Sequence, residues 1–194
     1  MPPKPTFVRE DVLAAAVKVV KEHGWRDCSA RTIAKELGSS TMPVYTALGS
    51  MEQLEKQVRA AAQNMIIDYQ VREYTDNPFV NEAIGYVLFA RDEPNLFRFL
   101  YVERGQPSSL EERREMQRVM LDRLQDSSAV QRVLTGISQE QLDQITVLSW
   151  IFVHGLAMLV NGGVLNLGED DIRQYVEESG SRTAMWVLNA PRRS

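Results

Sequence analysis

The chain has 194 residues, of which 44% are hydrophobic and 25% are charged, so it is long enough to fold around one large core or two small ones. Its formal net charge of −4 argues against a general binder of polyanions. The single cysteine, Cys28, excludes an intrachain disulfide and a cysteine-rich zinc site. One unpaired cysteine is typical of a reducing, cytoplasmic compartment.

The N-terminal residues contain no apolar signal core. The most hydrophobic stretch, 145–160, is interrupted by Ser149 and His154, and it falls short of the roughly 20 apolar residues that span a bilayer. We therefore expect neither export nor membrane insertion.

Apolar residues recur at helical spacing through nearly the whole chain, which predicts an all-α fold. A first helix is expected from about Arg9 to His23, before Gly24. Ser29 would cap a short second helix that stops at Gly38. A third helix, capped by Ser39 or Ser40, would run to about Ala47 and break at Gly49. Longer helices are predicted at Met51–Tyr74, at about 78–91, after Pro94, at Leu110–Gln125, at Leu142–Val160 and at Asp170–Leu188.

The second and third helices have the lengths and the tight connection of a helix-turn-helix, whose second helix enters the major groove of DNA. The turn needs a small residue, which Gly38 supplies. The inner faces of both helices need apolar residues, and the outer face of the second helix needs small polar ones. The apolar set is Ile33, Ala34, Leu37, Val44 and Leu48, and the polar set is Ser40, Thr41 and Thr46. Spacing alone leaves open three small helices of any bundle.

Residues Val8 to Leu54 resemble the N-terminal domain of TetR-family transcriptional regulators in order, spacing and identity. The resemblance is carried by Val12-Leu13-Ala14-Ala15-Ala16, Gly24, Ser29-Ala30-Arg31-Thr32-Ile33-Ala34, Leu37-Gly38, Val44-Tyr45 and Met51-Glu52-Gln53-Leu54. It implies a DNA-binding domain at residues 1–50 and a helical ligand-binding and dimerisation domain at residues 51–194. It also implies a repressor that a small hydrophobic effector releases from its operator.

The resemblance places the third helix in the major groove and Tyr45 on a phosphate. The expected DNA contacts are Ser29, Arg31, Thr32, Ser40, Thr41, Met42, Tyr45, Thr46 and Lys56. Tyr45 could instead close the small core. The sequence departs from the family pattern in Ala47-Leu48, where His-Phe is common, and in Met51, where a lysine usually opens the fourth helix. Lys56 could replace that lysine.

The charge is divided unevenly along the chain. The first 59 residues hold nine Lys and Arg against seven Asp and Glu, a formal charge of +2, and the remainder carries −6. The N-terminal part is therefore slightly basic, which suits DNA but predicts weak non-specific affinity.

The segment Trp150-Ile151-Phe152-Val153-His154-Gly155-Leu156 resembles the TetR regulatory subgroup that has Trp and His-Gly in its penultimate long helix. Such regulators dimerise through their last two helices, and a dimer would supply the second half-site reader. The interface candidates are Gly155, Leu159, Gly162, Met185 and Trp186. A monomeric core is the competing interpretation of the same residues.

Aromatic residues and methionines gather in the middle helices, as the lining of an effector pocket requires. The ligand candidates are Tyr86, Phe89, Phe97, Met120, Trp150, His154 and Met158. The alternative is that they only fill a core.

An enzyme is disfavoured, since the two histidines have no metal-ligand spacing and no Gly-x-Ser-x-Gly or phosphate-binding glycine loop is present. We expect no metal and no cofactor. A helical adaptor that binds proteins but no operator is the remaining alternative.

Overall fold

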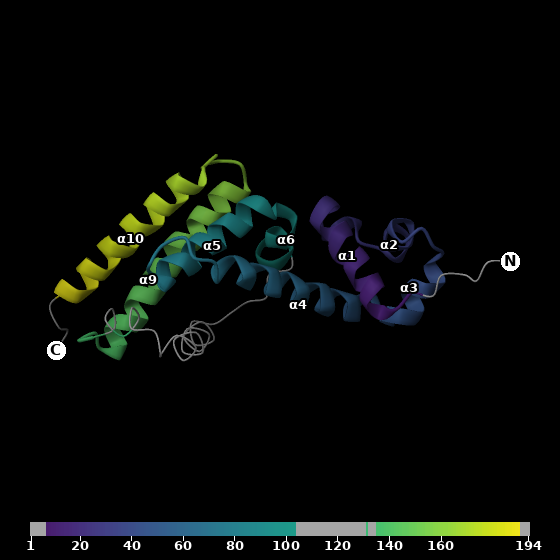
Figure 1. The fold of residues 1–194 in the computed structure, drawn as a ribbon, viewed down its shortest axis with the longest axis horizontal. Coiled ribbons are helices and arrows are strands. Elements are labelled where there is room, and N and C mark those ends of the chain that lie inside the picture. The colour runs from purple at the N-terminus through teal and green to yellow at the C-terminus, as the bar shows by residue number, and fades with distance from the viewer. Residues whose placement is uncertain (1–6, 104–130, 132–134, 191–194) are drawn as a thin grey trace. The chain divides into compact units, whose positions relative to one another are not determined.

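The computed structural model describes residues 7–103, 131 and 135–190, and these residues form helices without a strand (Figure 1). The all-α prediction is confirmed for this part of the chain. The elements are α1 Arg9–His23, the 3₁₀ turn η1 Trp25–Asp27, α2 Ala30–Glu36, α3 Thr41–Leu48, α4 Met51–Gln70, α5 Pro78–Asp92, α6 Pro94–Arg98, the π-helical turn η2 Phe99–Glu103, α9 Gln139–Asn161 and α10 Glu169–Asn189. The predicted helix Leu110–Gln125 lies outside the described residues.

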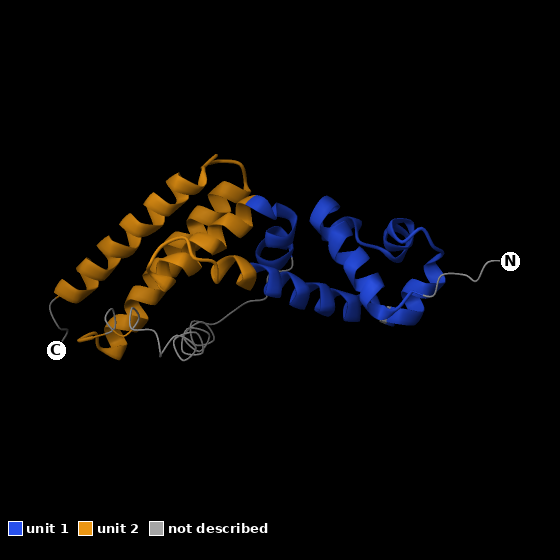
Figure 2. Cartoon of the chain, in the orientation of Figure 1, with its two compact units in different colours: residues 1–66, 92–106 blue, residues 67–91, 107–194 orange. Residues whose placement is uncertain are grey.

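The chain divides into two compact units (Figure 2). The first unit contains residues 1–66 and 92–106, and the second contains residues 67–91 and 107–194. These units differ from the predicted functional domains 1–50 and 51–194, because most of α4 and the segment from residue 92 belong to the first unit. The functional division stays a prediction.

The core of the first unit forms where α1, α2 and α3 pack on one another. Val12, Val20, Ile33 and Leu54 are each at most 1% exposed, and each lies on the apolar face of its helix. Burying an aliphatic side chain of this size contributes about 1.5–3 kcal/mol. This small core therefore fixes the positions of the two short helices α2 and α3.

The segment from residue 92 joins the first unit through contacts with α1 and η1. The Trp25 ring stacks on Phe99, with centroids 5.0 Å apart. The buried Glu93 pairs with Lys21, and Asn95 Nδ2 donates a hydrogen bond of 2.9 Å to the Lys21 carbonyl. Sequence reasoning missed these contacts because they join residues more than 70 positions apart.

In the second unit, α9 and α10 pack on each other. α9 is also long and apolar enough to cross a membrane by length and composition alone, contrary to the estimate from residues 145–160. The central helix of a water-soluble bundle can pass the same test. Its Leu156, Ala157 and Val160 are buried within the unit.

The predicted fourth helix, Met51–Tyr74, ends at Gln70, four residues early. The buried Asn81 is the physical reason. Its Oδ1 accepts hydrogen bonds from the backbone N–H groups of Tyr74 and Thr75, at 3.2 and 2.7 Å, and its Nδ2 donates to the Thr75 carbonyl. The chain therefore turns at residues 71–77 rather than continuing the helix.

Candidate functional site

The connection between α2 and α3 is the tight turn that the sequence predicted. Gly38 has a φ of +61°, which L side chains rarely adopt, and a Cβ placed there would meet nothing within 4 Å. Glycine is therefore needed for its backbone conformation and not for space. The Ser39 N–H donates to the Ala34 carbonyl at 2.9 Å, which closes the end of α2.

At the start of α2, Ser29 and Thr32 form a reciprocal cap. Ser29 Oγ accepts from the Thr32 N–H at 3.2 Å, and Thr32 Oγ1 accepts from the Ser29 N–H at 2.9 Å. Both hydroxyls thus hold the helix terminus in place. Arg31 is exposed beside them, so this end of α2 offers a guanidinium next to a helix N-terminus, an arrangement that suits a phosphate.

The outer face of α3 is exposed, while Val44 is buried beneath it. Met42 is 71% exposed and Tyr45 is 56% exposed, so most of the tyrosine lies outside the small core. Ser40, Thr41 and Thr46 are exposed as well. Thr46 Oγ1 donates to the Met42 carbonyl at 3.0 Å, one turn earlier in the helix. The helix therefore presents an apolar, an aromatic and several hydroxyl groups on one short surface.

Lys56, the candidate to replace a lysine at position 51, is exposed and paired with Glu52. Its Nζ lies 2.9 Å from Glu52 Oε1, one turn earlier on α4, and this hydrogen bond raises the pKa of the lysine. A phosphate at Lys56 would have to compete with that carboxylate. Met51 is 37% exposed and supplies no charge.

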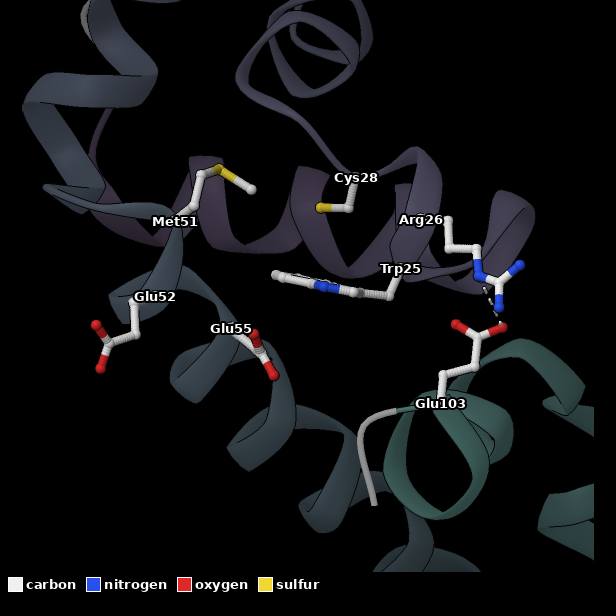
Figure 3. Close-up of a pocket in the computed structure, with 7 residues that line it drawn as sticks. All are labelled: Trp25, Arg26, Cys28, Met51, Glu52, Glu55 and Glu103. Atoms are coloured by element: carbon white, nitrogen blue, oxygen red, sulfur yellow. Dashed lines mark ion pairs between the residues drawn. The ribbon is translucent and has the colours of Figure 1, made fainter. Parts of the chain in front are cut away.

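Beside η1 and the start of α4 lies a groove of about 610 Å³ (Figure 3). It is lined by Trp25, Arg26, Cys28, Met51, Glu52, Glu55 and Glu103. Each lining carboxylate has a basic neighbour: Glu52 has Lys56, Glu55 has Arg59 at 3.6 Å and Glu103 has Arg98 at 3.4 Å. Burial raises the pKa of Cys28 to about 11, so the thiol is a packing group rather than a nucleophile.

In the second unit, the structure brings together three of the predicted effector residues. The Tyr86 hydroxyl and His154 Nδ1 are hydrogen-bonded at 2.9 Å. The Trp150 ring stacks on His154, with centroids 5.4 Å apart and an interplanar angle of 20°. α5 and α9 therefore meet at a phenol, an imidazole and an indole, three groups that combine apolar surface with hydrogen-bonding capacity.

The other effector candidates are placed elsewhere. Phe89 is fully buried in the second unit, with its ring edge-on to Tyr69 at 5.6 Å. Phe97 belongs to the first unit, where its ring lies 5.0 Å from that of Tyr101. Met158 is 39% exposed, and Met120 lies outside the described residues. Their roles in ligand binding stay predictions.

Sequence reasoning missed Glu82, one helical turn before Tyr86 on α5. Its side chain is half-buried, and burial raises its pKa to about 7. The described residues give it no basic neighbour, whereas the shielded Glu93, Glu103 and Glu55 each lie within 4.0 Å of a Lys or Arg nitrogen. A shielded carboxyl with a perturbed pKa is a signal of a functional site.

All five predicted interface residues are exposed in the single chain. Leu159 is 43% exposed, Met185 59% and Trp186 61%. Ile151 extends this surface on α9, with Gly155, Leu159 and Gly162 at helical spacing after it. A Cβ at Gly155 would meet nothing within 4 Å. Exposed large apolar side chains on two adjacent helices make this face a candidate interaction surface.

Across the described ranges, 7–103 and 135–190, no three His, Cys, Asp or Glu residues gather in a way that could hold a metal ion. The described residues of α2 and α3 carry hydroxyls, a guanidinium and exposed apolar groups, and α5 and α9 carry Glu82, Tyr86, Trp150 and His154.

Comparisons with known proteins find similarity to one family. Residues 80–179, more than half of the chain, match the family model of the tetracyclin repressor-like C-terminal domain. A TetR-like transcriptional regulator from Rhodococcus sp. RHA1 has a similar structure, with a TM-score of 0.59, 18% identity, and coverage of 93% of this chain and 97% of that one. A protein of unknown function from the same organism gives a TM-score of 0.64 at 20% identity, covering 95% of this chain and 97% of its own.

A search of curated protein sequences finds no match. The structural likenesses establish the fold, and the match over residues 80–179 establishes the family. The chain belongs to the TetR family of transcriptional regulators.

Proposed function

We propose that the protein is a dimeric, cytoplasmic repressor that binds an operator through α2 and α3 and leaves it when a small hydrophobic effector binds the second unit. The observation that carries the proposal is the exposed outer face of α3 next to the Gly38 turn. Met42 and Tyr45 are large and mostly exposed there, whereas Val44 on the same helix is buried in the first unit's core. An apolar contact with a thymine methyl and a hydroxyl bonded to a phosphate would use both side chains.

Dimerisation supports the same function, since one helix-turn-helix reads only a half-site. The exposed residues of α9 and α10 described above form the proposed interface. Fully burying side chains of their size in a partner contributes about 1.5–3 kcal/mol each before the cost of association. Met185 and Trp186, adjacent on α10, are the largest of these exposed side chains.

The proposed effector site is the cluster of Tyr86, His154 and Trp150. A ligand releases DNA only if it binds the conformation incompatible with the operator more tightly than the compatible one. The family's repressors work through such coupling between two sites, and the second unit provides the polar and aromatic groups for the ligand.

The experiment is a selection of bound sequences from random double-stranded DNA with the full chain, followed by titration of the enriched site. We expect specific binding that weakens steeply with salt, because several phosphates release counterions. Tyr45→Ala should weaken it by about tenfold at every related sequence, as loss of a phosphate contact predicts. Tyr45→Phe, which lacks only the hydroxyl, separates the hydrogen bond from the ring contact.

A helical adaptor would enrich no sequence and would show no salt-dependent DNA binding. That result, with the protein folded and dimeric, would contradict the proposed function.

A further inference from the structure

The register of α5 against α9 places Glu82 near the aromatic cluster of the second unit. Tyr86 meets His154, and Asn161 Nδ2 donates to the Ala90 carbonyl at 2.9 Å. Because both residue numbers rise together, the two helices run in the same direction, as Figure 1 shows. One turn back from Tyr86 and from His154 lie Glu82 and Trp150, at the same level on adjacent helices.

Four residues on the facing turns of α5 and α9, which we call the Glu82 cluster, are placed together by this register: Glu82, Tyr86, Trp150 and His154. The Trp150–His154 stack supplies a flat apolar wall. The hydrogen bond between Tyr86 and His154 holds the phenol and the imidazole together. Glu82, one helical turn before Tyr86 on α5, supplies an acidic group that no described Lys or Arg neutralises.

An ionised carboxylate shielded from water is unfavourable unless a cation accompanies it. Elsewhere in this protein Lys21, Arg98 and Arg59 perform that task for Glu93, Glu103 and Glu55. Among the described residues, no Lys or Arg performs that task for Glu82. A bound cation at Glu82 would also gain from the aromatic rings, because an ammonium group is attracted to an aromatic face.

We propose that the Glu82 cluster binds a small organic cation, with the ammonium group at Glu82 and the apolar body against the Trp150–His154 stack. This inference rests on the proposed function and narrows its effector from a hydrophobic molecule to a cationic amphipathic one. Neutral and anionic molecules of the same shape would leave the carboxyl without a counter-ion.

The test uses three probes with a common phenylalkyl body: 4-phenylbutylamine, 4-phenylbutanol and 4-phenylbutyrate. Their binding to the full-length protein is measured by calorimetry without DNA at a pH above 8, where Glu82 is mostly ionised. We expect the amine to bind about tenfold more tightly than the alcohol, as a charge-assisted contact predicts, and the carboxylate to bind most weakly.

Variants separate the charge from the shape. Glu82→Gln should bring the amine to the affinity of the alcohol and leave the alcohol unchanged. Glu82→Asp keeps the negative charge on a side chain shorter by one methylene, so it should retain part of the preference for the amine over the alcohol. Glu177→Gln, at an exposed position on α10, is the matched control and should behave as the unmodified protein.

Equal affinity for the amine and the alcohol, tighter binding of the carboxylate, or a preference that survives in Glu82→Gln would overturn the inference. Failure of all three probes to bind at millimolar concentration would overturn it as well. If the amine binds as expected but does not weaken operator binding, the ligand class stands and the effector role in the proposed function falls. If no operator is found, the calorimetry still decides the inference.

Discussion

The ionised carboxylate of Glu82 lowers the free energy of unfolding, and the size of this effect depends on pH. Its folded-state pKa of about 7 lies above the ordinary 4.5, so the folded protein holds the proton more tightly than the unfolded chain does. Below about 4.5 both states are protonated and nothing is lost. As the pH rises from 4.5 to 7 the folded state loses stability, and above 7 the whole penalty is present.

We therefore predict that Glu82→Gln stabilises the protein at pH 8. The full shift would correspond to roughly 3 kcal/mol, and partial exposure of the side chain reduces the expected gain to about 1–2 kcal/mol. Urea unfolding at pH 8 and at pH 5 measures it, and most of the gain should be absent at pH 5. Glu177→Gln should change stability by less than about 0.5 kcal/mol at either pH. A variant less stable at pH 8 would show that the carboxylate has a stabilising partner.

The burial of Glu82 could not be predicted from the sequence. A charged residue in an amphipathic helix is usually solvated, and helical spacing does not show which neighbours cover it. Tyr86 and His154 were both proposed as effector residues from family resemblance and residue type. Their hydrogen bond, between positions 68 apart in sequence, needed the packing of α5 on α9 to be seen.

At the scale of the elements, the close approach of α4 and α5 depends on one glycine. A Cβ at Gly85 would lie 2.3 Å from the Tyr69 carbonyl oxygen and 2.7 Å from Gln70 Cα, and these are backbone atoms that a side-chain rotation cannot move. We predict that Gly85→Ala destabilises the fold by about 1–3 kcal/mol, as overpacking does.

Gly180 in α10 is the matched control, since a Cβ there would meet nothing within 4 Å. Gly180→Ala should raise the stability by about 0.5–1 kcal/mol, because alanine is favoured over glycine inside a helix. Denaturant unfolding of both variants measures the contrast. Equal effects at the two positions would contradict the packing argument.

Helix ends were predictable where a local signal sets them. α1 runs over the predicted Arg9–His23, because Gly24 adopts a φ of +83° directly after it. The cap at Ser29 was likewise predictable from a short pattern. The end of α4 was not predictable in this way. The backbone N–H groups of Tyr74 and Thr75, just after α4, donate to the side chain of Asn81 on the next helix, and no local sequence pattern indicates these bonds.

At the scale of the whole molecule, the described residues form two compact units, and large apolar side chains of α9 and α10 are exposed in the second. The functional domains 1–50 and 51–194, predicted from family resemblance, stay a prediction. The compact units follow other bounds, because the segment from residue 92 packs on the first unit through the stacking of Trp25 on Phe99. The chain passes between the two units three times, at 66/67, 91/92 and 106/107, so a change in the second unit has three covalent routes into the first.

The exposed apolar residues of α9 and α10 predict a dimer interface that a larger side chain at Gly155 would disrupt. Gly155 is exposed and a Cβ there would meet nothing within 4 Å in the described chain, so Gly155→Leu should leave the monomer folded and at least as stable, because leucine favours a helix more than glycine does. If this surface is the dimer interface, the same side chain prevents the close approach of the partner helix. We expect sedimentation velocity to show a dimer for the unmodified protein and at least a tenfold weaker dimer for the variant, which corresponds to about 1.4 kcal/mol.

Trp186→Glu should have the same effect by placing a charge in an apolar interface. The Gly180→Ala protein, changed elsewhere on α10, should remain dimeric. Operator affinity measured on the same samples should fall together with the loss of dimer, since each half-site then binds alone. A Gly155→Leu protein that dimerises like the unmodified one would place the interface on another surface.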